Sequence, residues 1–275
     1  MTETINAPAR PKLVNYQAEG GIATIELNDP PAHSYTYEMM LDFDEAILRA
    51  RLDPGVYVGV IRGAGDRFFC GGANIRMLQR SDPTFKYYFC LHANETLNRL
   101  PKTRKLFIAA INGHCVGGGL EVALACDILI GWQGPNKISI GFPESNLGLL
   151  PGTAGTQRLA RTINHRQAIE LMALGQTFDL ARAKELGILN RVFEAETVEA
   201  FMAQVLEYGR NFCPPKRAAR AVGAIKRAVW GGQGLPEEVA QYLERELMGD
   251  LFQSLDGGEG LKASVEKRPP VFQGR

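Results

Sequence analysis

Short, largely apolar runs that each lead into a glycine-bearing loop and a helical pattern most constrain how this chain can fold. Val56–Ile61 (VYVGVI) precedes the loop RGAGDRFFCGGANI, and Phe107–Asn112 (FIAAIN) precedes GHCVGGG. Two more strand candidates, Asp127–Trp132 and Lys137–Phe142, follow the helical segment after that second loop. Runs without polar alternation are typical of strands that are buried on both faces. The alternation of strand, loop and helix therefore predicts an α/β fold with short buried strands.

The flanking segments complete this outline. Two β-prone runs within Val14–Leu27 are separated by Glu-Gly-Gly, which predicts a hairpin. Tyr37–Leu52 carries apolar residues at helical spacing, and from about residue 154 the pattern is mainly helical, with a short strand candidate at Leu189–Phe193. We therefore expect a flexible tail over residues 1–12, a core over 13–200 and a helical region over 201–275.

Composition excludes several classes of function. The 31 basic and 30 acidic residues leave a net charge of +1, so no strong field favours nucleic acid or an anionic membrane. The five cysteines are odd in number and lack zinc-site spacing, which favours reduced thiols, and the four histidines show no metal-binding spacing. No apolar run approaches the roughly 18 residues of a membrane span, and the first twelve residues lack the apolar core of a signal peptide. We expect a cytoplasmic protein without a metal.

A run of three glycines, Gly117–Gly119, leads into a predicted helix that has Glu121 in its first turn. A helix N-terminus offers unpaired N–H groups, and glycines let another molecule approach them closely. A dinucleotide loop would need glycine where Val122 stands, and no Walker A lysine occurs in the chain. A first-turn glutamate would also repel a pyrophosphate. A neutral carbonyl that becomes negative only during a reaction fits this segment better.

A second N–H donor and a second carboxylate come from two other strand ends. Cys70–Asn74 (CGGAN) is another glycine-rich strand exit, and Glu144 ends the stretch SIGFPE. Two glutamates beside a pair of N–H groups suit proton transfer around an activated carbonyl. The residues alone also fit a first-turn glutamate that favours the helix dipole and a capping or surface role for Glu144. They indicate an α/β enzyme, with carbonyl chemistry as one interpretation.

The motifs in their order resemble the enoyl-CoA hydratase/isomerase (crotonase) superfamily along nearly the whole chain. The matching segments agree in spacing as well as in residues. They are Phe69–Ile75 (FCGGANI), Ile108–Asp127 (IAAINGHCVGGGLEVALACD), Ile140–Leu159 (IGFPESNLGLLPGTAGTQRL) and Val265–Arg275 (VEKRPPVFQGR).

The resemblance implies a crotonase-type spiral of ββα units with a helical C-terminal trimerisation region. It implies a homo-oligomer, either a trimer or a dimer of trimers (a hexamer). The substrate would be an acyl-CoA thioester of fatty acid metabolism, with coenzyme A as part of the substrate and no other cofactor. No nucleic acid and no membrane would be partners.

The resemblance also assigns roles by position. The backbone N–H groups of Ala73 and Gly118 would form the oxyanion hole for the thioester oxygen. Glu121 would activate water toward C3, Glu144 would supply the C2 proton, and Gly152 would help hold the water. Both glutamates are kept, which favours a 2-enoyl-CoA hydratase, a lyase, over the alternatives of a double-bond isomerase or a C–C hydrolase acting on a CoA thioester. A non-catalytic RNA-binding relative is a remote alternative, against which the net charge and the glutamate pair weigh.

Some positions implied to contact the acyl group or CoA depart from the family pattern. Asn74 stands where many relatives have aspartate, and His33-Ser34-Tyr35 replaces a common Asn-Ala-Leu. These polar and aromatic groups predict an acyl chain that is not a plain alkyl. The full set of implied contacts is Ala32, His33, Tyr35, Gly71, Asn74, Ile75 and Lys267.

Overall fold

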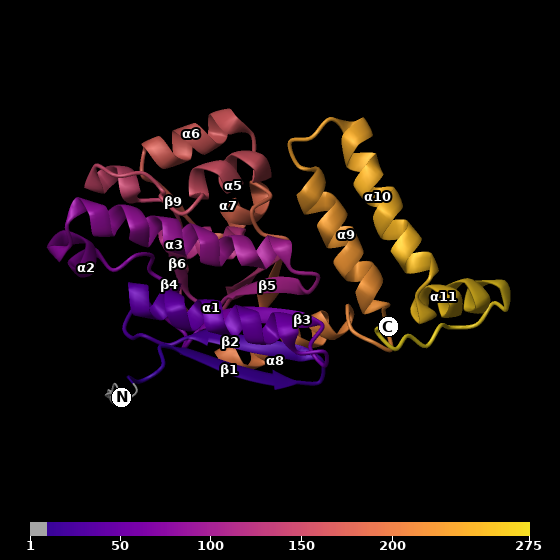
Figure 1. Cartoon of the computed structure of the whole chain (residues 1–275). Helices are drawn as coiled ribbons and strands as arrows, with labels where there is room; N and C mark the ends of the chain where they lie inside the picture. Colours follow the sequence, from indigo (N-terminus) through magenta and orange to yellow (C-terminus); the bar gives the residue numbers. More distant parts are fainter. Residues whose placement is uncertain (1–9) are drawn as a thin grey trace, which may run out of the picture.

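The strands form two sheets in the computed structural model, which describes residues 10–275 (Figure 1). The larger sheet has six strands in the order β1-β2-β3-β5-β7-β10. Its first two strands form the predicted antiparallel hairpin, and every later pair is parallel. The bounds are β1 Val14–Glu19, β2 Ile22–Leu27, β3 Val58–Gly63, β5 Leu106–Ile111, β7 Ile128–Gln133 and β10 Arg191–Glu194.

A smaller sheet contains three strands that directly follow β3, β5 and β7 along the chain. Its order is β4-β6-β8-β9, with β4 Phe68–Cys70, β6 His114–Val116, β8 Ile140–Gly141 and β9 Thr177–Phe178. The chain passes from β3 to β4, from β5 to β6 and from β7 to β8, and after each pair it enters a helical segment. This repetition confirms the expected spiral of ββα units. Because β4, β6 and β8 are parallel neighbours, the loops that follow them lie side by side.

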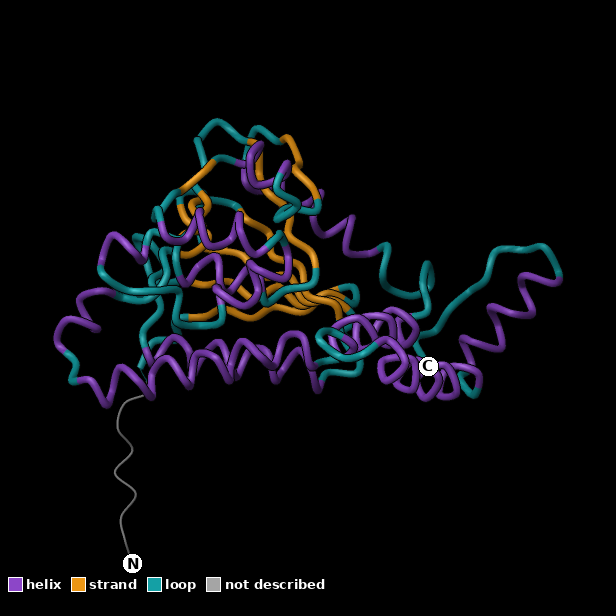
Figure 2. Tube along the Cα trace, turned by 90° about the horizontal axis from the view of Figure 1, so that it is seen from above, coloured by secondary structure: helices purple, strands orange, loops and turns teal. Residues whose placement is uncertain are grey.

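Helices surround the sheets, and the last two, α10 and α11, extend away from them (Figures 1 and 2). Helix α8 packs on the larger sheet, against β2, β3, β5 and β7. The bounds are α1 Tyr37–Leu52, α2 Ile75–Arg80, α3 Pro83–Lys102, α4 Gly118–Leu124, the 3₁₀ turn η1 Glu144–Leu147, α5 Gly155–Thr162, α6 His165–Ala173, α7 Leu180–Glu185, α8 Val198–Arg210, α9 Ala219–Gly232, α10 Glu237–Phe252 and α11 Leu255–Val265.

Helix α9 is fastened to the body by a buried ion pair. Nζ of Lys226 lies 2.7 Å from Oδ2 of Asp127, which stands just before β7, and it also donates to two backbone carbonyls. The indole of Trp230 donates to the other oxygen of Asp127 at 2.7 Å. A buried pair is tolerated only when its remaining hydrogen-bonding groups are satisfied, as they are here. The ion pair therefore attaches α9 to the residue that precedes β7.

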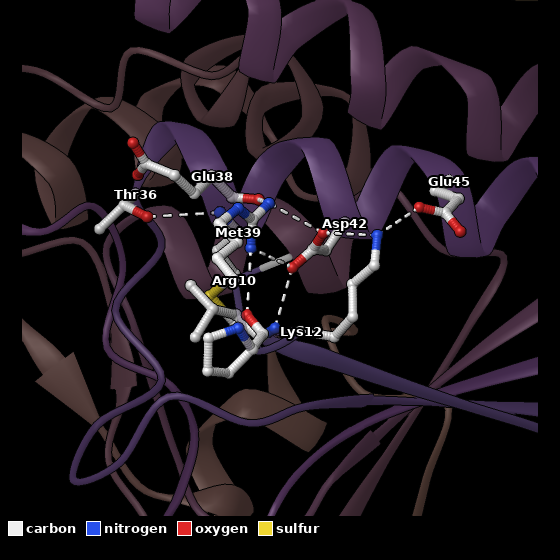
Figure 3. Close-up of polar contacts among 9 residues, drawn as sticks. Arg10, Lys12, Thr36, Glu38, Met39, Asp42 and Glu45 are labelled. Carbon is white, nitrogen blue, oxygen red and sulfur yellow. Dashed lines mark hydrogen bonds and ion pairs between the residues drawn. The ribbon is translucent and has the colours of Figure 1, made fainter. Parts of the chain in front are cut away.

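Helix α1 is held at its outer face by residues that precede β1 (Figure 3). The Arg10 guanidinium donates to both oxygens of Asp42 at 2.7 and 2.9 Å, and Nζ of Lys12 lies 3.1 Å from one of them. The backbone N–H of Leu13 donates to the same carboxylate at 2.8 Å. Residues 1–9 of the expected tail lie outside the described residues, whereas this end of it is held against α1.

The elements differ from the sequence expectations mainly at strand ends. Helix α1 has the predicted bounds, because Thr36 caps it and accepts a hydrogen bond from the N–H of Met39. Strand β8 is only two residues long, not the run over 137–142, since it pairs only where the three-residue β6 lies beside it. None of the helices in residues 10–275 combines the length and the apolar character that crossing a membrane requires.

Candidate active site

Glu144 and the N-terminus of α4 meet where the loops after β6 and β8 lie together. Gly117 has a φ of 56°, a conformation that favours glycine, and its N–H donates to the carbonyl of Gly141 at 2.8 Å. A Cβ on Gly117 would lie 2.8 Å from Oε1 of Glu144. The glycine run therefore lets the Glu144 carboxyl approach the start of α4.

The two predicted N–H donors come from adjacent loops. A Cβ on Gly72 would lie 2.9 Å from the backbone nitrogen of Gly118, so the loop after β4 touches the start of α4. Ala73 forms an isolated parallel bridge with Tyr35. Over residues 10–275, the N–H groups of Ala73 and Gly118 donate to no protein acceptor. Both remain available to an oxygen from another molecule.

Glu121 is buried and strongly hydrogen-bonded. Its Oε1 accepts the N–H groups of Thr153 and Gly155 at 2.6 Å each, and its Oε2 accepts the Thr153 hydroxyl. Only 1% of the residue is exposed. Burial raises the pKa of Glu121, while these hydrogen bonds and the charge of Arg158 act in the opposite direction. The donors hold the carboxylate in one orientation.

Glu144 lies in a contrasting environment. It is half-buried at the start of η1, and among the described residues its buried Oε2 has no hydrogen-bond partner. Burial, with a contribution from the charge of Glu121, raises the pKa of Glu144 to about 7. Burial thus raises the pKa of both carboxyls, but they differ in their hydrogen bonds, and such a difference in environment is the usual basis for assigning one as acid and the other as base.

Sequence reasoning missed the residues that support Glu121. The hydroxyl of Thr153 and its N–H lie in the PGTAGT loop, next to the predicted Gly152. The buried guanidinium of Arg158 donates to the carbonyl of Thr153 at 2.9 Å and to Asn98 at 2.9 Å. The available signal was a threonine directly after Gly152, in a segment already selected for its glycines.

Several implied acyl contacts have structural partners. Both ring nitrogens of His33 are engaged by backbone groups, Nδ1 by the N–H of Asp29 at 3.1 Å and Nε2 by the carbonyl of Ala64 at 2.9 Å. The side chain of Asn74 caps α2 by accepting the N–H of Met77 at 3.0 Å. Both ring nitrogens of His33 are thus engaged, whereas Asn74 uses only its side-chain oxygen for the cap.

The other predicted positions separate into a group at the site and one distant residue. Ala32 accepts the N–H of Gly71 at 2.8 Å, and Gly152 accepts the amide of Asn94 at 3.1 Å. Ile75, at the start of α2, is exposed. Lys267 follows α11, which Figure 1 places at the opposite end of the molecule from β4 and β6. A single chain does not bring Lys267 to the two glutamates.

Metal chemistry has no evident ligand set in the described part of the chain. Within residues 10–275, no group of three or more histidine, cysteine, aspartate or glutamate side chains is arranged to hold a metal ion. The five cysteines are free thiols, and four of them are buried.

Available N–H groups in adjacent loops and two unequal carboxyls define a site for acid–base chemistry on a carbonyl compound. The chain belongs to the enoyl-CoA hydratase/isomerase family, whose sequence profile matches residues 17–275. It is 30% identical to a probable enoyl-CoA hydratase of Bacillus subtilis, over 92% of this chain and 95% of that protein. It is 32% identical to the (E)-benzylidenesuccinyl-CoA hydratase of Thauera aromatica, over 95% and 99%.

Solved structures agree with this membership. An enoyl-CoA hydratase of Geobacillus kaustophilus superimposes with a TM-score of 0.91 at 40% identity, and the match covers 97% of this chain and 98% of that one. An enoyl-CoA hydratase of Bacillus anthracis gives a TM-score of 0.88 at 26% identity, over 96% and 100%. The crotonase fold expected from the sequence is confirmed.

Proposed function

We propose that this protein is a 2-enoyl-CoA hydratase, a hydro-lyase that adds water across the 2,3-double bond of an acyl-CoA thioester. The pair of carboxyls carries this proposal, because Glu121 is held by three donors while Glu144 keeps an unpaired buried oxygen and a pKa of about 7. Hydratases named among the relatives support the same class of reaction. Coenzyme A would enter as part of the substrate, and we propose no further cofactor.

In the proposed reaction, the thioester oxygen accepts the N–H groups of Ala73 and Gly118. Glu121 takes a proton from water as the water oxygen attacks C3, and the electron pair of the double bond moves through C2 onto the thioester oxygen. Fixed N–H donors stabilise that charge where it forms, and losing one such donor typically costs about 10²–10³ in rate. Glu144 then gives a proton to C2, and the enolate collapses to the 3-hydroxyacyl thioester.

The different environments of the carboxyls favour these roles. A carboxyl with a pKa of about 7 is protonated in a large fraction of molecules at neutral pH and can act as the acid. Burial raises the pKa of Glu121, but its three hydrogen bonds favour the ionised form that the base requires. We propose that Gly152, which lies directly before Thr153, helps to hold the attacking water.

We also propose that the working form is a homotrimer or a dimer of trimers. Helices α10 and α11 expose a series of apolar side chains, which a separate chain would leave in water. They are Tyr242, Met248, Phe252, Leu255, Leu261 and Val265. Exposed apolar patches of this kind mark protein–protein contacts.

An assay with a panel of 2-enoyl-CoA thioesters, including aromatic and branched acyl groups, tests the proposed reaction. We expect loss of the conjugated enoyl-thioester absorbance and a product one water heavier by mass spectrometry. Glu121→Gln and Glu144→Gln should each lower kcat by about 10²–10⁴, while Glu196→Gln, at an exposed site, serves as the control. A shifted double bond or a cleaved carbon chain, with no added water, would replace hydratase by isomerase or C–C hydrolase.

A further inference from the structure

Two buried hydroxyl groups form a chain that ends on Glu121. The Oη of Tyr35 lies 3.1 Å from Oγ1 of Thr153, and the Thr153 hydroxyl donates to Oε2 of Glu121. Tyr35 and Thr153 are each 4% exposed, and Glu121 is 1% exposed. This hydrogen-bond chain connects Tyr35, before α1, with Glu121 in α4 through Thr153, which lies in a loop.

The direction of the hydrogen bonds is fixed when Glu121 is ionised, as the base of the proposed reaction must be. An ionised carboxylate only accepts, and the Thr153 hydroxyl has a single hydrogen, which it gives to Oε2. The Thr153 oxygen must therefore accept from Tyr35, although either hydroxyl could donate on distance alone. Burial, followed by the charge of Glu121, raises the pKa of Tyr35 well above its ordinary value, so its phenol keeps the proton that it donates.

The number of acceptor sites on the Glu121 carboxylate shows how the hydrogen-bond chain affects this residue as a base. A carboxylate has about four lone-pair sites. The N–H groups of Thr153 and Gly155 occupy those of Oε1, and the Thr153 hydroxyl occupies one of Oε2. One site on Oε2 remains for a proton from another molecule. The Thr153 hydroxyl decides which site that is, and Tyr35 fixes how that hydroxyl points.

Tyr35 also joins this base to the loop that carries the other half of the site. Its N–H donates to the carbonyl of Gly72 at 2.9 Å, and its carbonyl accepts the N–H of Asn74 at 3.0 Å, on either side of Ala73. Its Oη is so close to the start of α4 that a Cβ on Gly118 would lie 2.1 Å away. The ring packs against Phe89 with centroids 5.9 Å apart. Tyr35 thus lies beside both predicted N–H donors and beside the Thr153 hydroxyl that supports Glu121.

We propose that Tyr35 is a positioning residue that acts through the Thr153 hydroxyl. It orients Glu121 relative to the oxyanion-hole loop and favours the ionised form of the Glu121 carboxyl. The inference deepens the proposed hydratase function and rests on it for its kinetic consequences. The hydrogen-bond chain itself is independent of which substrate is bound. Tyr35 therefore has a role beyond that of an acyl contact.

Kinetics of three variants test the relay. Tyr35→Phe removes only the hydroxyl, and we expect kcat to fall about tenfold, the size of one net hydrogen bond, with KM changed less than threefold. Thr153→Val should cost more, about 10–100-fold, because it removes the bond to the charged group, whereas Thr153→Ser should restore most of kcat. The Tyr35→Phe/Thr153→Val double variant should match Thr153→Val, since both substitutions interrupt one chain.

The pH profile separates positioning from packing. Loss of the Tyr35 hydroxyl weakens the Thr153 hydrogen bond that favours the ionised form of Glu121, so the pKa of Glu121 should rise and the acidic limb of kcat/KM should move to higher pH in Tyr35→Phe. Tyr37→Phe is the matched control, because this neighbouring tyrosine is 39% exposed. Circular dichroism and the melting temperature should show that all the variants are folded.

A titration without turnover distinguishes failure of the relay from failure of the proposed reaction. Carbon-13 NMR of labelled glutamate carboxyls, with Glu121→Gln protein to assign the signal, should give a higher Glu121 pKa in Tyr35→Phe than in the parent protein. This shift is expected even if no enoyl-CoA is hydrated. An unchanged titration together with an unchanged acidic limb would overturn the relay, as would a loss confined to KM, which would make Tyr35 an acyl contact only.

Discussion

Glu121 and Glu144 differ at the level of single hydrogen bonds. Glu121 accepts two backbone N–H groups and a hydroxyl, whereas the buried Oε2 of Glu144 has no partner among the described residues. An unsatisfied buried oxygen favours the neutral carboxyl, because the charged form loses its solvation without compensation. The asymmetry lies in the loops around the carboxyls, since the side chains themselves are chemically identical.

This asymmetry predicts a bell-shaped pH profile for kcat/KM. The reaction needs Glu144 protonated, and its pKa is about 7, so kcat/KM should fall about tenfold per unit of pH well above that value. It also needs Glu121 ionised, so activity should fall on the acidic side. Steady-state assays from pH 5 to 9 measure both limbs, which are macroscopic values because the two carboxyls interact.

Glu144→Gln provides the check on that assignment. The glutamine cannot titrate, so the residual activity should lose its alkaline limb near pH 7 while the acidic limb persists. An alkaline limb that is unchanged in the variant would assign it to another group.

Sequence alone located the two glutamates and their glycine neighbours but missed how Glu121 is supported. The glycine runs are easy to recognise in the sequence, because a backbone that must lie close to another group needs glycine. Thr153 lies 32 residues from Glu121 along the chain, and nothing local to either residue indicates the contact. Sequence reasoning likewise missed that both ring nitrogens of His33 are engaged by backbone groups, from Asp29 and Ala64.

At the scale of elements, α1 determines where Tyr35 lies. The helix begins two residues after it, behind the Thr36 cap, and the cluster of Arg10, Lys12 and Asp42 fixes the helix from outside (Figure 3). The Asp42 side chain is 1% exposed and receives three different donors. A shift of α1 would therefore move the tyrosine that supports Glu121.

Asp42→Asn tests this attachment. Burial raises the pKa of Asp42, but the hydrogen bonds from Arg10, Leu13 and Lys12 outweigh it and leave the pKa below its ordinary value. A lowered folded-state pKa contributes stability above the unfolded value and loses it as the pH falls through the folded value. At pH 7 we expect a loss of about 2 kcal/mol, or about 4 °C in melting temperature.

The difference between Asp42→Asn and the parent protein should shrink as the pH falls through the lowered pKa of Asp42, because the parent carboxyl then also becomes protonated. Glu45→Gln is the control, because the Lys12–Glu45 pair is more than half exposed on both sides and should contribute little. Equal effects of the two substitutions, or a difference that stays constant with pH, would contradict this account of the cluster.

Helices were predicted more accurately than strands for a physical reason. The bounds of α1 follow from its own cap and its apolar spacing, which are local. The length of β8 depends on β6 and β9, which pair with it from distant parts of the chain. Strand ends are set by such neighbours, so a run of apolar residues gives the strand but not its limits.

At the scale of the whole molecule, the C-terminal helices have a different character from the body. Beyond the Lys226–Asp127 attachment, α10 and α11 extend away from the sheets (Figures 1 and 2). Phe252 and Leu255, at the junction between these helices, are 66% and 65% exposed. Sequence periodicity could predict the helices but not what covers them, because the covering surface belongs to no nearby segment.

We expect this region to be buried against further copies of the chain. Light scattering should give a mass three or six times 30.2 kDa. Burying a phenylalanine or leucine side chain contributes about 1.5–3 kcal/mol, and a closed ring repeats that contribution in every copy. The double variant Phe252→Ser/Leu255→Ser should therefore dissociate at micromolar concentrations at which the parent protein stays assembled.

Leu52→Ser is the matched control, because Leu52 is 77% exposed but ends α1 on the body. Its mass should equal that of the parent protein. If the parent protein were a stable 30.2 kDa monomer at micromolar concentration, the exposed apolar faces of α10 and α11 would need another partner. If instead both serine variants dissociated equally, the contact would extend over the body and would not be confined to the C-terminal helices.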